Sequence, residues 1–121
     1  MDSSKKKYNL FLEGLILFNN KQFYEAHEYW EELWLEHHLE DKKFIQGLIQ
    51  LTVAYYHLST GNSKGALSLL NKSLDKIQLF VPRNRGMNID LIVKTTKESI
   101  EMVDGGVDFN WDIVPTLEVE E

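Results

Sequence analysis

The first 81 residues of this 121-residue chain contain no proline, and the two prolines present are Pro82 and Pro115. Proline interrupts helices because it lacks an amide proton and clashes with the preceding turn. The proline-free part can therefore form long helices, and its apolar residues recur at the helical spacing of three to four. This pattern predicts four helices joined by short polar turns, over residues 8–19, 21–38, 43–60 and 63–80.

The remainder of the chain predicts a fifth helix and an extended end. Asn88 is a suitable N-cap for a helix that runs to about Val103, and two glycines then end it. Residues 107–117 carry apolar side chains at every second position around a proline, which favours an extended segment lying over the helices. Asn20 and Asn62 are the expected N-caps of the second and fourth helices, and Gly61 is expected to end the third.

The predicted fold class is all-α, a five-helix antiparallel array of helical hairpins with an extended C-terminal segment. A chain of this length suits one domain, so residues 1–121 are expected to form a single unit. Residues 1–7 and 118–121 are polar and are predicted to be disordered tails. Residues 81–86 are predicted to form a loop, and the sequence specifies no oligomeric state.

Charge, cysteine content and hydropathy exclude several classes of function. The net charge of -6 makes the chain acidic and argues against nucleic-acid binding, which requires a basic surface. The absence of cysteine excludes disulfides, thiolate zinc sites and cysteine nucleophiles. No apolar run approaches the ~20 residues of a membrane span, and no signal-peptide pattern is present. We therefore expect a cytoplasmic protein with neither nucleic acid nor membrane as a partner.

The stretch from Phe23 to Trp34 combines large rings with many acids. On a helical wheel His27 and Glu31 fall in the middle of the aromatic face, one turn apart. On the opposite side, where solvent is expected, lie Glu25, Tyr29, Glu32 and Glu36. A carboxylate among rings is costly unless it is paired or bound to a metal. The pattern therefore predicts a buried polar site on this helix.

The third predicted helix carries a narrow polar stripe on an otherwise apolar surface. Its members are Gln46, Gln50 and His57, which share one side of the wheel. Because a short connection makes the second and third helices antiparallel, Gln50 and His57 are expected to face His27 and Glu31. Four polar side chains would then meet in one interhelical pocket.

One interpretation of this pocket is a metal site. His27, Glu31 and His57 would be the ligands, because two histidines and a carboxylate commonly hold a divalent metal and leave positions open for water. Glu28 would act as the catalytic base. The corresponding function is that of a metal-dependent hydrolase.

Two other interpretations remain open. The pocket is a small-molecule site if Trp30 and Trp34, with Tyr55 and Tyr56, form its walls and the polar groups orient the ligand. The protein is then a non-enzymatic binding or interaction module, with Gln46, Gln50 and the loop residue Arg83 as further contacts. Alternatively, the polar cluster is a closed hydrogen-bonded network that fixes the helix register.

Several motifs resemble the small helical family known as domain of unknown function 309. They are Phe11-x2-Gly14-x3-Phe18-Asn19, Tyr24-Glu25-Ala26-His27-Glu28-x-Trp30-Glu31-x2-Trp34, Phe44-x-Gln46-Gly47-Leu48-Ile49-Gln50 and His57-x3-Gly61-Asn62-x2-Gly65-Ala66. The resemblance runs from about Phe11 to Leu74 and implies a compact all-α protein without an established activity. Members are sometimes labelled predicted metal-dependent hydrolases. The shared polar positions correspond to His27, Glu28, Glu31, Gln46, Gln50 and His57.

Overall fold

A computed structural model describes residues 3–120 of the chain. Within these residues there are five α-helices, one short antiparallel hairpin and two single turns of 3-10 helix. The helices are α1 (Ser3–Asn19), α2 (Phe23–Glu36), α3 (Lys42–Ser59), α4 (Ser63–Ile77) and α5 (Ile89–Asp104); the strands are β1 (Arg83–Asn84) and β2 (Met87–Asn88); the 3-10 turns are η1 (Gln78–Phe80) and η2 (Trp111–Ile113). The predicted all-α class is confirmed.

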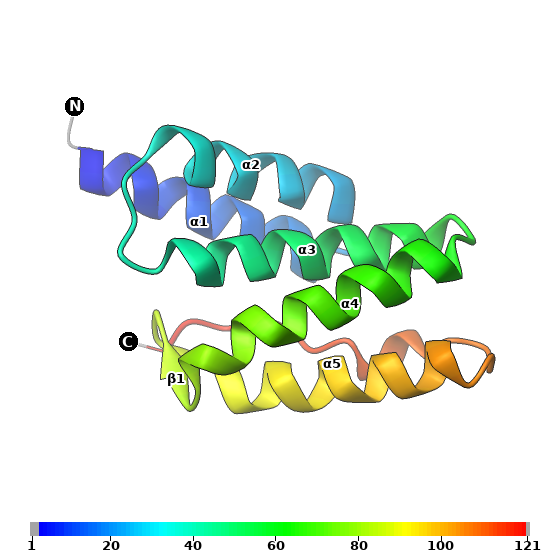
Figure 1. The fold of residues 1–121 in the computed structure, drawn as a ribbon. Helices are drawn as coiled ribbons and strands as arrows, with labels where there is room; N and C mark the ends of the chain where they lie inside the picture. Colours follow the sequence, from blue (N-terminus) through cyan, green and yellow to red (C-terminus); the bar gives the residue numbers. More distant parts are fainter. Residues whose placement is uncertain (1–2, 121) are drawn as a thin grey trace.

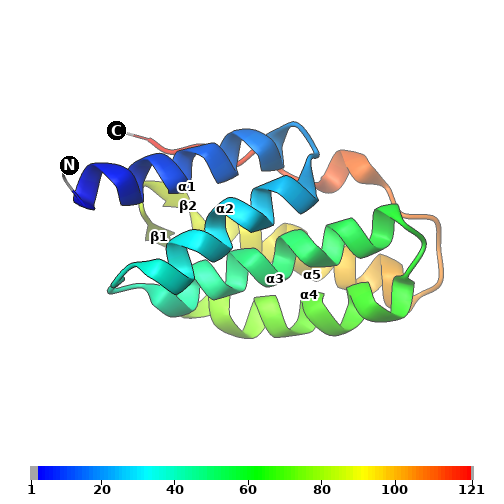
Figure 2. The same ribbon diagram turned by 90° about the horizontal axis from the view of Figure 1, so that it is seen from above.

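Each helix packs against the next one along the chain, α1 with α2, α2 with α3, α3 with α4 and α4 with α5. Figure 1 shows α1 and α2 on one side of α3, and α4 and α5 on the other. The helix α3 lies between these two pairs (Figure 1), and it has a fully buried side formed by Phe44, Ile45, Leu48 and Ala54. Successive helices run in opposite directions, as predicted for an array of hairpins (Figures 1 and 2).

The turns between helices follow their predicted chemistry in two places and depart from it in a third. Asn62 accepts a hydrogen bond from the amide of Gly65, and Asn88 accepts one from Leu91, so both N-caps are confirmed. Asn20 does not cap α2; Gln22 stands at that position and its side chain makes no capping bond. The reason is that Lys21 adopts a left-handed φ of 62°, which extends the turn and delays the start of the helix.

Residues 81–86 were expected to be a loop, but most of this stretch belongs to a β-hairpin. Arg83 pairs with Asn88 and Asn84 pairs with Met87. The two residues between the strands, Arg85 and Gly86, have φ angles of 53° and 74°. Positive φ at both positions matches the turn that joins two twisted strands. An arginine is rare in that conformation, so the sequence does not suggest it.

The prediction of disordered tails is wrong for the described parts of both ends. The helix α1 begins at Ser3, because serine and lysine continue the helical pattern upstream of Tyr8. At the other end, the amide of Glu120 donates to the carbonyl of Gly86 over 2.8 Å. Its carboxylate also lies 2.8 Å from the guanidinium of Arg83. Residues 1–2 and 121 lie outside the described part of the chain.

The segment predicted to be extended, residues 107–117, is interrupted by the single turn η2 at residues 111–113. After this turn, the C-terminal segment, residues 114–120, contains neither helix nor strand. It runs back along α1 and α5 toward the end of the molecule where α1 starts (Figure 2). Leu117 is its buried side chain, with 4% of its surface exposed. Preceding it, Trp111 stacks on Phe23 with 5.9 Å between ring centroids. The turn η2 therefore packs on the aromatic core, and the segment after it is bound to the end of α1 and to the hairpin.

The contact between α1 and α2 is formed around Trp30. Its indole is fully buried, and its Nε1 donates to the carbonyl of Phe11 over 3.1 Å. A Cβ added to Gly14 would overlap the indole ring, so the absence of a side chain at this position allows the two helices to approach closely. No helix within residues 3–120 is both long and apolar enough to cross a membrane.

Candidate functional site

The buried side of α2 is not the one that the helical wheel predicted. Its members are Phe23, Ala26, Trp30 and Leu33. The side chains of His27 and Glu31 are 18% and 47% exposed, so Glu31 does not point into the core. The wheel was centred on the largest rings, although Tyr24 is 49% exposed, whereas the small Ala26 belongs to the core. His27 and Glu31 therefore lie at the border between the core and the solvent-exposed side.

His27 and Glu31 form an ion pair along α2. The Nε2 atom of His27 lies 3.2 Å from a carboxylate oxygen of Glu31, one turn later. The Nδ1 atom of the same ring is hydrogen-bonded to the carbonyl of Tyr24. Since a carbonyl only accepts, Nδ1 carries a proton, and Nε2 then faces a second acceptor. The imidazole of His27 therefore has a polar partner at each of its two ring nitrogens.

The other members of the predicted pocket are not brought into a metal site. Within residues 3–120 no group of three or more histidine, aspartate or glutamate side chains is arranged to hold a metal ion. His57 lies near the end of α3, where its Nδ1 is 3.4 Å from the amide nitrogen of Asn62. His27 and Glu31 remain the two predicted ligands that are in contact. The assignment of Glu28 as a base and of His57 as a ligand stays a prediction.

The aromatic residues predicted to line a ligand pocket divide between core and surface. Trp30 and Tyr55 are fully buried, and the hydroxyl of Tyr55 lies 3.0 Å from that of Ser99. Burial raises the pKa of Tyr55 to about 12, against the opposing effect of the hydrogen bond to Ser99. Neither ring leaves a face open for a ligand. Both are core residues, so their predicted role as pocket walls is wrong.

Trp34 and the two glutamines are half-buried. The ammonium of Lys42 lies 4.6 Å from the centre of the Trp34 ring, close enough for a cation–π contact. The indole Nε1 of Trp34 and Oε1 of Gln50 are buried, and neither has a hydrogen-bond partner among the described residues. Gln46 lies one turn before Gln50 on α3. These side chains do not close the hydrogen-bonded network that was one interpretation of the cluster.

The solvent-exposed side of α2 forms an open groove with a volume of about 400 Å³. We call this surface the acidic face; its residues are Tyr24, His27, Glu28, Glu31, Glu32, Leu35 and Glu36. The helix contains five glutamates and neither lysine nor arginine. Because the whole chain has a net charge of -6, the remaining residues together are close to neutral. The negative charge of the protein is thus concentrated on one helix.

Rings border this acidic face at its N-terminal end. The ring of Tyr24 lies 5.0 Å from that of His27 and 5.4 Å from that of Tyr56 on α3. Tyr29 and Leu35 are also exposed on α2, Leu35 by 63%. The face therefore combines carboxylates with accessible apolar surface.

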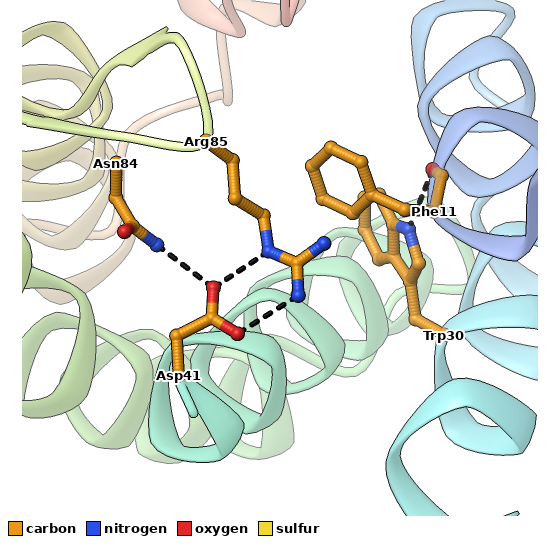
Figure 3. Close-up of polar contacts among 5 residues, drawn as sticks. All are labelled: Phe11, Trp30, Asp41, Asn84 and Arg85. Carbon is orange, nitrogen blue, oxygen red and sulfur yellow. Dashed lines mark hydrogen bonds and ion pairs between the residues drawn. The ribbon is translucent and has the colours of Figure 1, made fainter. Parts of the chain in front are cut away.

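A second polar group joins the hairpin to α3 (Figure 3). The guanidinium of Arg85 donates to both carboxylate oxygens of Asp41, over 2.6 and 2.8 Å. The amide of Asn84 donates to the same carboxylate over 2.9 Å. Burial by itself raises the pKa of Asp41, but the hydrogen bonds and charge of Arg85 outweigh it and lower the pKa of this carboxyl. The guanidinium also lies 4.6 Å from the ring centre of Phe11 on α1.

This second group has a structural role, because the carboxylate of Asp41 and the guanidinium of Arg85 pair with each other and tie the hairpin to the start of α3. Sequence reasoning did not identify the pair, whose members are 44 positions apart. The predicted binding residue Arg83, two positions earlier, pairs with Glu120 instead of an anionic ligand.

Residues 11–69 match the family described as Domain of unknown function (DUF309). This match confirms the resemblance predicted from the sequence motifs. It covers the second half of α1, all of α2 and α3, and the first half of α4. The acidic face and the His27–Glu31 pair lie inside the matched residues.

Two curated relatives are similar to the chain. An uncharacterized protein of Aquifex aeolicus (strain VF5) is 29% identical over 85 residues, which are 69% of this chain and 26% of that protein. The uncharacterized protein YpuF of Bacillus subtilis (strain 168) is 34% identical over 70 residues, 56% of this chain and 40% of YpuF. The chain therefore spans less than half the length of either relative.

Proposed function

We propose that this protein is a helical binding module whose acidic face on α2 binds a lysine- or arginine-rich segment of a partner protein. The concentration of charge supports this proposal, because five glutamates and no basic residue except His27 occupy the helix. Among residues 3–120, His27 beside Glu31 is the one basic side chain that forms an ion-pair contact with any of these glutamates. A basic partner would supply the missing positive charge.

The arrangement of the glutamates is unfavourable for the helix alone. Glu28 and Glu32, and Glu32 and Glu36, are four positions apart, and like charges at this spacing destabilise a helix by ~0.2–0.5 kcal/mol per pair. Glu36 is also the last residue of α2, where a negative charge opposes the helix dipole. A bound cationic segment would relieve both effects. Part of the binding free energy would therefore come from the loss of repulsion between the glutamates of α2 when the cationic segment binds.

The apolar groups on this face favour a basic peptide over a simple cation. Tyr24 is 49% exposed, and its ring is available for a cation–π contact with a guanidinium or ammonium group. Leu35 exposes surface on which the methylene groups of a lysine or arginine can pack. The matched region is part of much longer relatives, which is compatible with a module that acts beside other domains.

A charge-reversal experiment with a matched control tests this proposal. The probe is a labelled peptide rich in lysine and arginine, and its binding is followed by fluorescence anisotropy at low and physiological salt. The test variant is Glu28→Lys with Glu32→Lys. The control is Glu98→Lys with Glu101→Lys on α5, which changes the net charge by the same amount. We expect affinity to fall by about tenfold or more in the test variant, a loss of ~1.4 kcal/mol.

The control separates a specific face from a general attraction to an acidic protein. It should lose less than about threefold, because a distant charge is largely screened at physiological salt. Equal losses in the two variants, or no binding to the unmodified chain, would contradict the proposal. Metal-dependent hydrolysis is the other function predicted from the sequence. Two of its three predicted metal ligands, His27 and Glu31, are in contact.

A further inference from the structure

The C-terminal segment contacts the helices as a bound peptide contacts a receptor. The amide of Leu117 donates to Oδ1 of Asn19 over 2.8 Å, and Nδ2 of Asn19 donates to the carbonyl of Leu117 over 3.0 Å. One side chain at the end of α1 thus satisfies both backbone groups of one extended residue. These bonds involve the backbone of the segment, so they do not depend on which side chain stands there.

A second anchor lies three residues further on, at the hairpin. The amide of Glu120 donates to the carbonyl of Gly86 over 2.8 Å. A Cβ on Gly86 would lie 2.6 Å from the carbonyl oxygen of Glu120, so the segment approaches the hairpin backbone as closely as a glycine allows. The carboxylate of Glu120 also pairs with Arg83, although both side chains are largely exposed. The surface under the segment therefore binds its backbone at two places, Asn19 and Gly86, and provides the guanidinium of Arg83 for its carboxylate.

The side chains of the segment alternate as in a strand. Leu117 is buried and Val119 is half-buried, whereas Glu118 between them is exposed. On one side of Leu117, Met87, Leu91 and Ile92 line a hollow of about 130 Å³. On the other side, a hollow of about 360 Å³ is lined mainly by apolar residues of α1 and by Leu117 and Val119.

The segment leaves part of this apolar surface uncovered. Tyr8 and Ile16, which line the larger hollow, are 47% and 53% exposed, and Leu91 beside the smaller one is 39% exposed. Large apolar side chains gathered at a groove indicate an interaction site more strongly than the same residues scattered singly. An occupant that reached these side chains would bury more apolar area than residues 117–120 do.

We propose that the groove formed by α1, α5 and the hairpin is a docking site for an extended segment of a partner protein. The segment that fits it has the pattern apolar-x-apolar-Glu, and residues 117–120, Leu-Glu-Val-Glu, occupy the site as an intramolecular competitor. The two anchors at Asn19 and Gly86 set the direction of the bound backbone. This site lies on a different face from α2 and does not depend on the function proposed for the acidic face.

The competition has a simple physical basis. A tethered segment has an effective concentration in the millimolar range, so a partner segment must bind more tightly to displace it. A partner segment gains the extra contacts with Tyr8, Ile16 and Leu91 that residues 117–120 do not cover. Displacement would release the end of the chain and change the surface that it presents.

The experiment uses the full chain and a labelled peptide with the sequence of residues 114–121. In Leu117→Asp the chain's own segment is released, because a buried carboxylate is costly. We expect this variant to bind the added peptide about tenfold or more tightly than the unmodified chain does. Thr116→Asp is the matched control, since it adds the same charge at an exposed neighbour. It should bind the peptide as weakly as the unmodified chain.

A second change removes the receptor instead of the competitor. Adding Asn19→Ala to Leu117→Asp should abolish the gained binding, because the backbone of the peptide loses both bonds. Circular dichroism confirms that each variant is folded, and Leu117→Ser replaces Leu117→Asp if the latter is not. Absence of binding to a folded release variant would overturn the proposal, as would binding that the Asn19 change leaves unaltered.

Discussion

The indole of Trp30 fills the space that a side chain at position 14 would need. A Cβ on Gly14 would overlap the ring, and the ring in turn donates to the carbonyl of Phe11 one turn earlier on α1. The glycine and the tryptophan therefore form one contact, in which a missing side chain on α1 accommodates the largest side chain on α2. Trp30 holds the two helices together and is not available as a ligand contact.

Gly14→Ala is expected to lower the free energy of unfolding by ~1–3 kcal/mol, because the added methyl forces the indole or the α1 backbone to move. Chemical denaturation followed by tryptophan fluorescence measures this change. The neighbouring Glu13→Ala is the control, since Glu13 is exposed and its replacement should change stability by less than ~0.5 kcal/mol. If the two variants were equally stable, the helix contact would be more adaptable than the geometry indicates.

Asp41→Asn is expected to destabilise the protein by ~1.5–3 kcal/mol at neutral pH, the range for hydrogen bonds to charged groups. The pKa of Asp41 is lowered in the folded state from its ordinary value of 3.8. The stabilisation is therefore fully present above pH ~5 and is lost as the pH falls through the folded pKa. Urea denaturation of both proteins between pH 7 and pH 2 should show their stabilities converging at acid pH. A constant difference across this range would refute the role of the ionised carboxylate.

Tyr55→Phe tests the buried hydroxyl pair. At neutral pH its loss should cost ~0.5–1.5 kcal/mol, because Ser99 keeps its bond to the carbonyl of Thr95. The pKa of Tyr55 is raised from 10.0 to about 12, so above pH 10 the unfolded chain loses this proton before the folded one does. Stability should then fall by up to ~1.4 kcal/mol per pH unit from this residue. Denaturation between pH 9 and pH 12 should show a shallower decline in the variant; an identical decline would contradict the burial of the hydroxyl.

Metal content distinguishes the hydrolase hypothesis from the binding module. Protein purified without a histidine tag is analysed by mass spectrometry for zinc, iron and manganese, as the unmodified chain, His27→Ala and His57→Ala. We expect His57→Ala to leave the metal content unchanged, because no group of three candidate ligands forms within the described residues. Stoichiometric metal that disappears in both variants would instead establish His27 and His57 as ligands of one site.

The helices were predictable because their information is local. Apolar spacing, the capping residues Asn62 and Asn88, and the glycine at position 61 with its φ of 84° all act within a few positions of the chain. Such signals retain their meaning whatever the rest of the fold does. The start of α2 was misplaced because the positive φ of Lys21 has no sequence signature.

The orientation of α2 was less predictable, since a wheel ranks positions by residue type and not by neighbours. Tyr24 and Leu35 are apolar yet exposed, whereas Ala26 is small yet fully buried. What decides the buried side is the fit against α1, where Trp30 meets Gly14. The position of His27 and Glu31 at the border of the core follows from that contact.

The pair formed by Asp41 and Arg85 was beyond sequence reasoning for a different reason. An aspartate before a helix and an arginine in a turn are each ordinary surface residues when considered alone. Their contact requires the β-hairpin, and the hairpin requires two successive positive φ angles, one of them at Arg85 itself. Long-range pairs of this kind depend on the completed fold, so one sequence gives no signal for them.

The side-chain amide of Asn19 has a consequence for how the C-terminal groove selects its occupant. It offers one donor and one acceptor, so α1 ends in the equivalent of a single rung of a β-ladder. That rung fixes the register of any strand that lies there, whatever its sequence. Affinity is then decided separately, by the side chains on either side of the rung. Side chains of the bound segment can therefore be substituted one at a time without changing the position of its backbone in the groove.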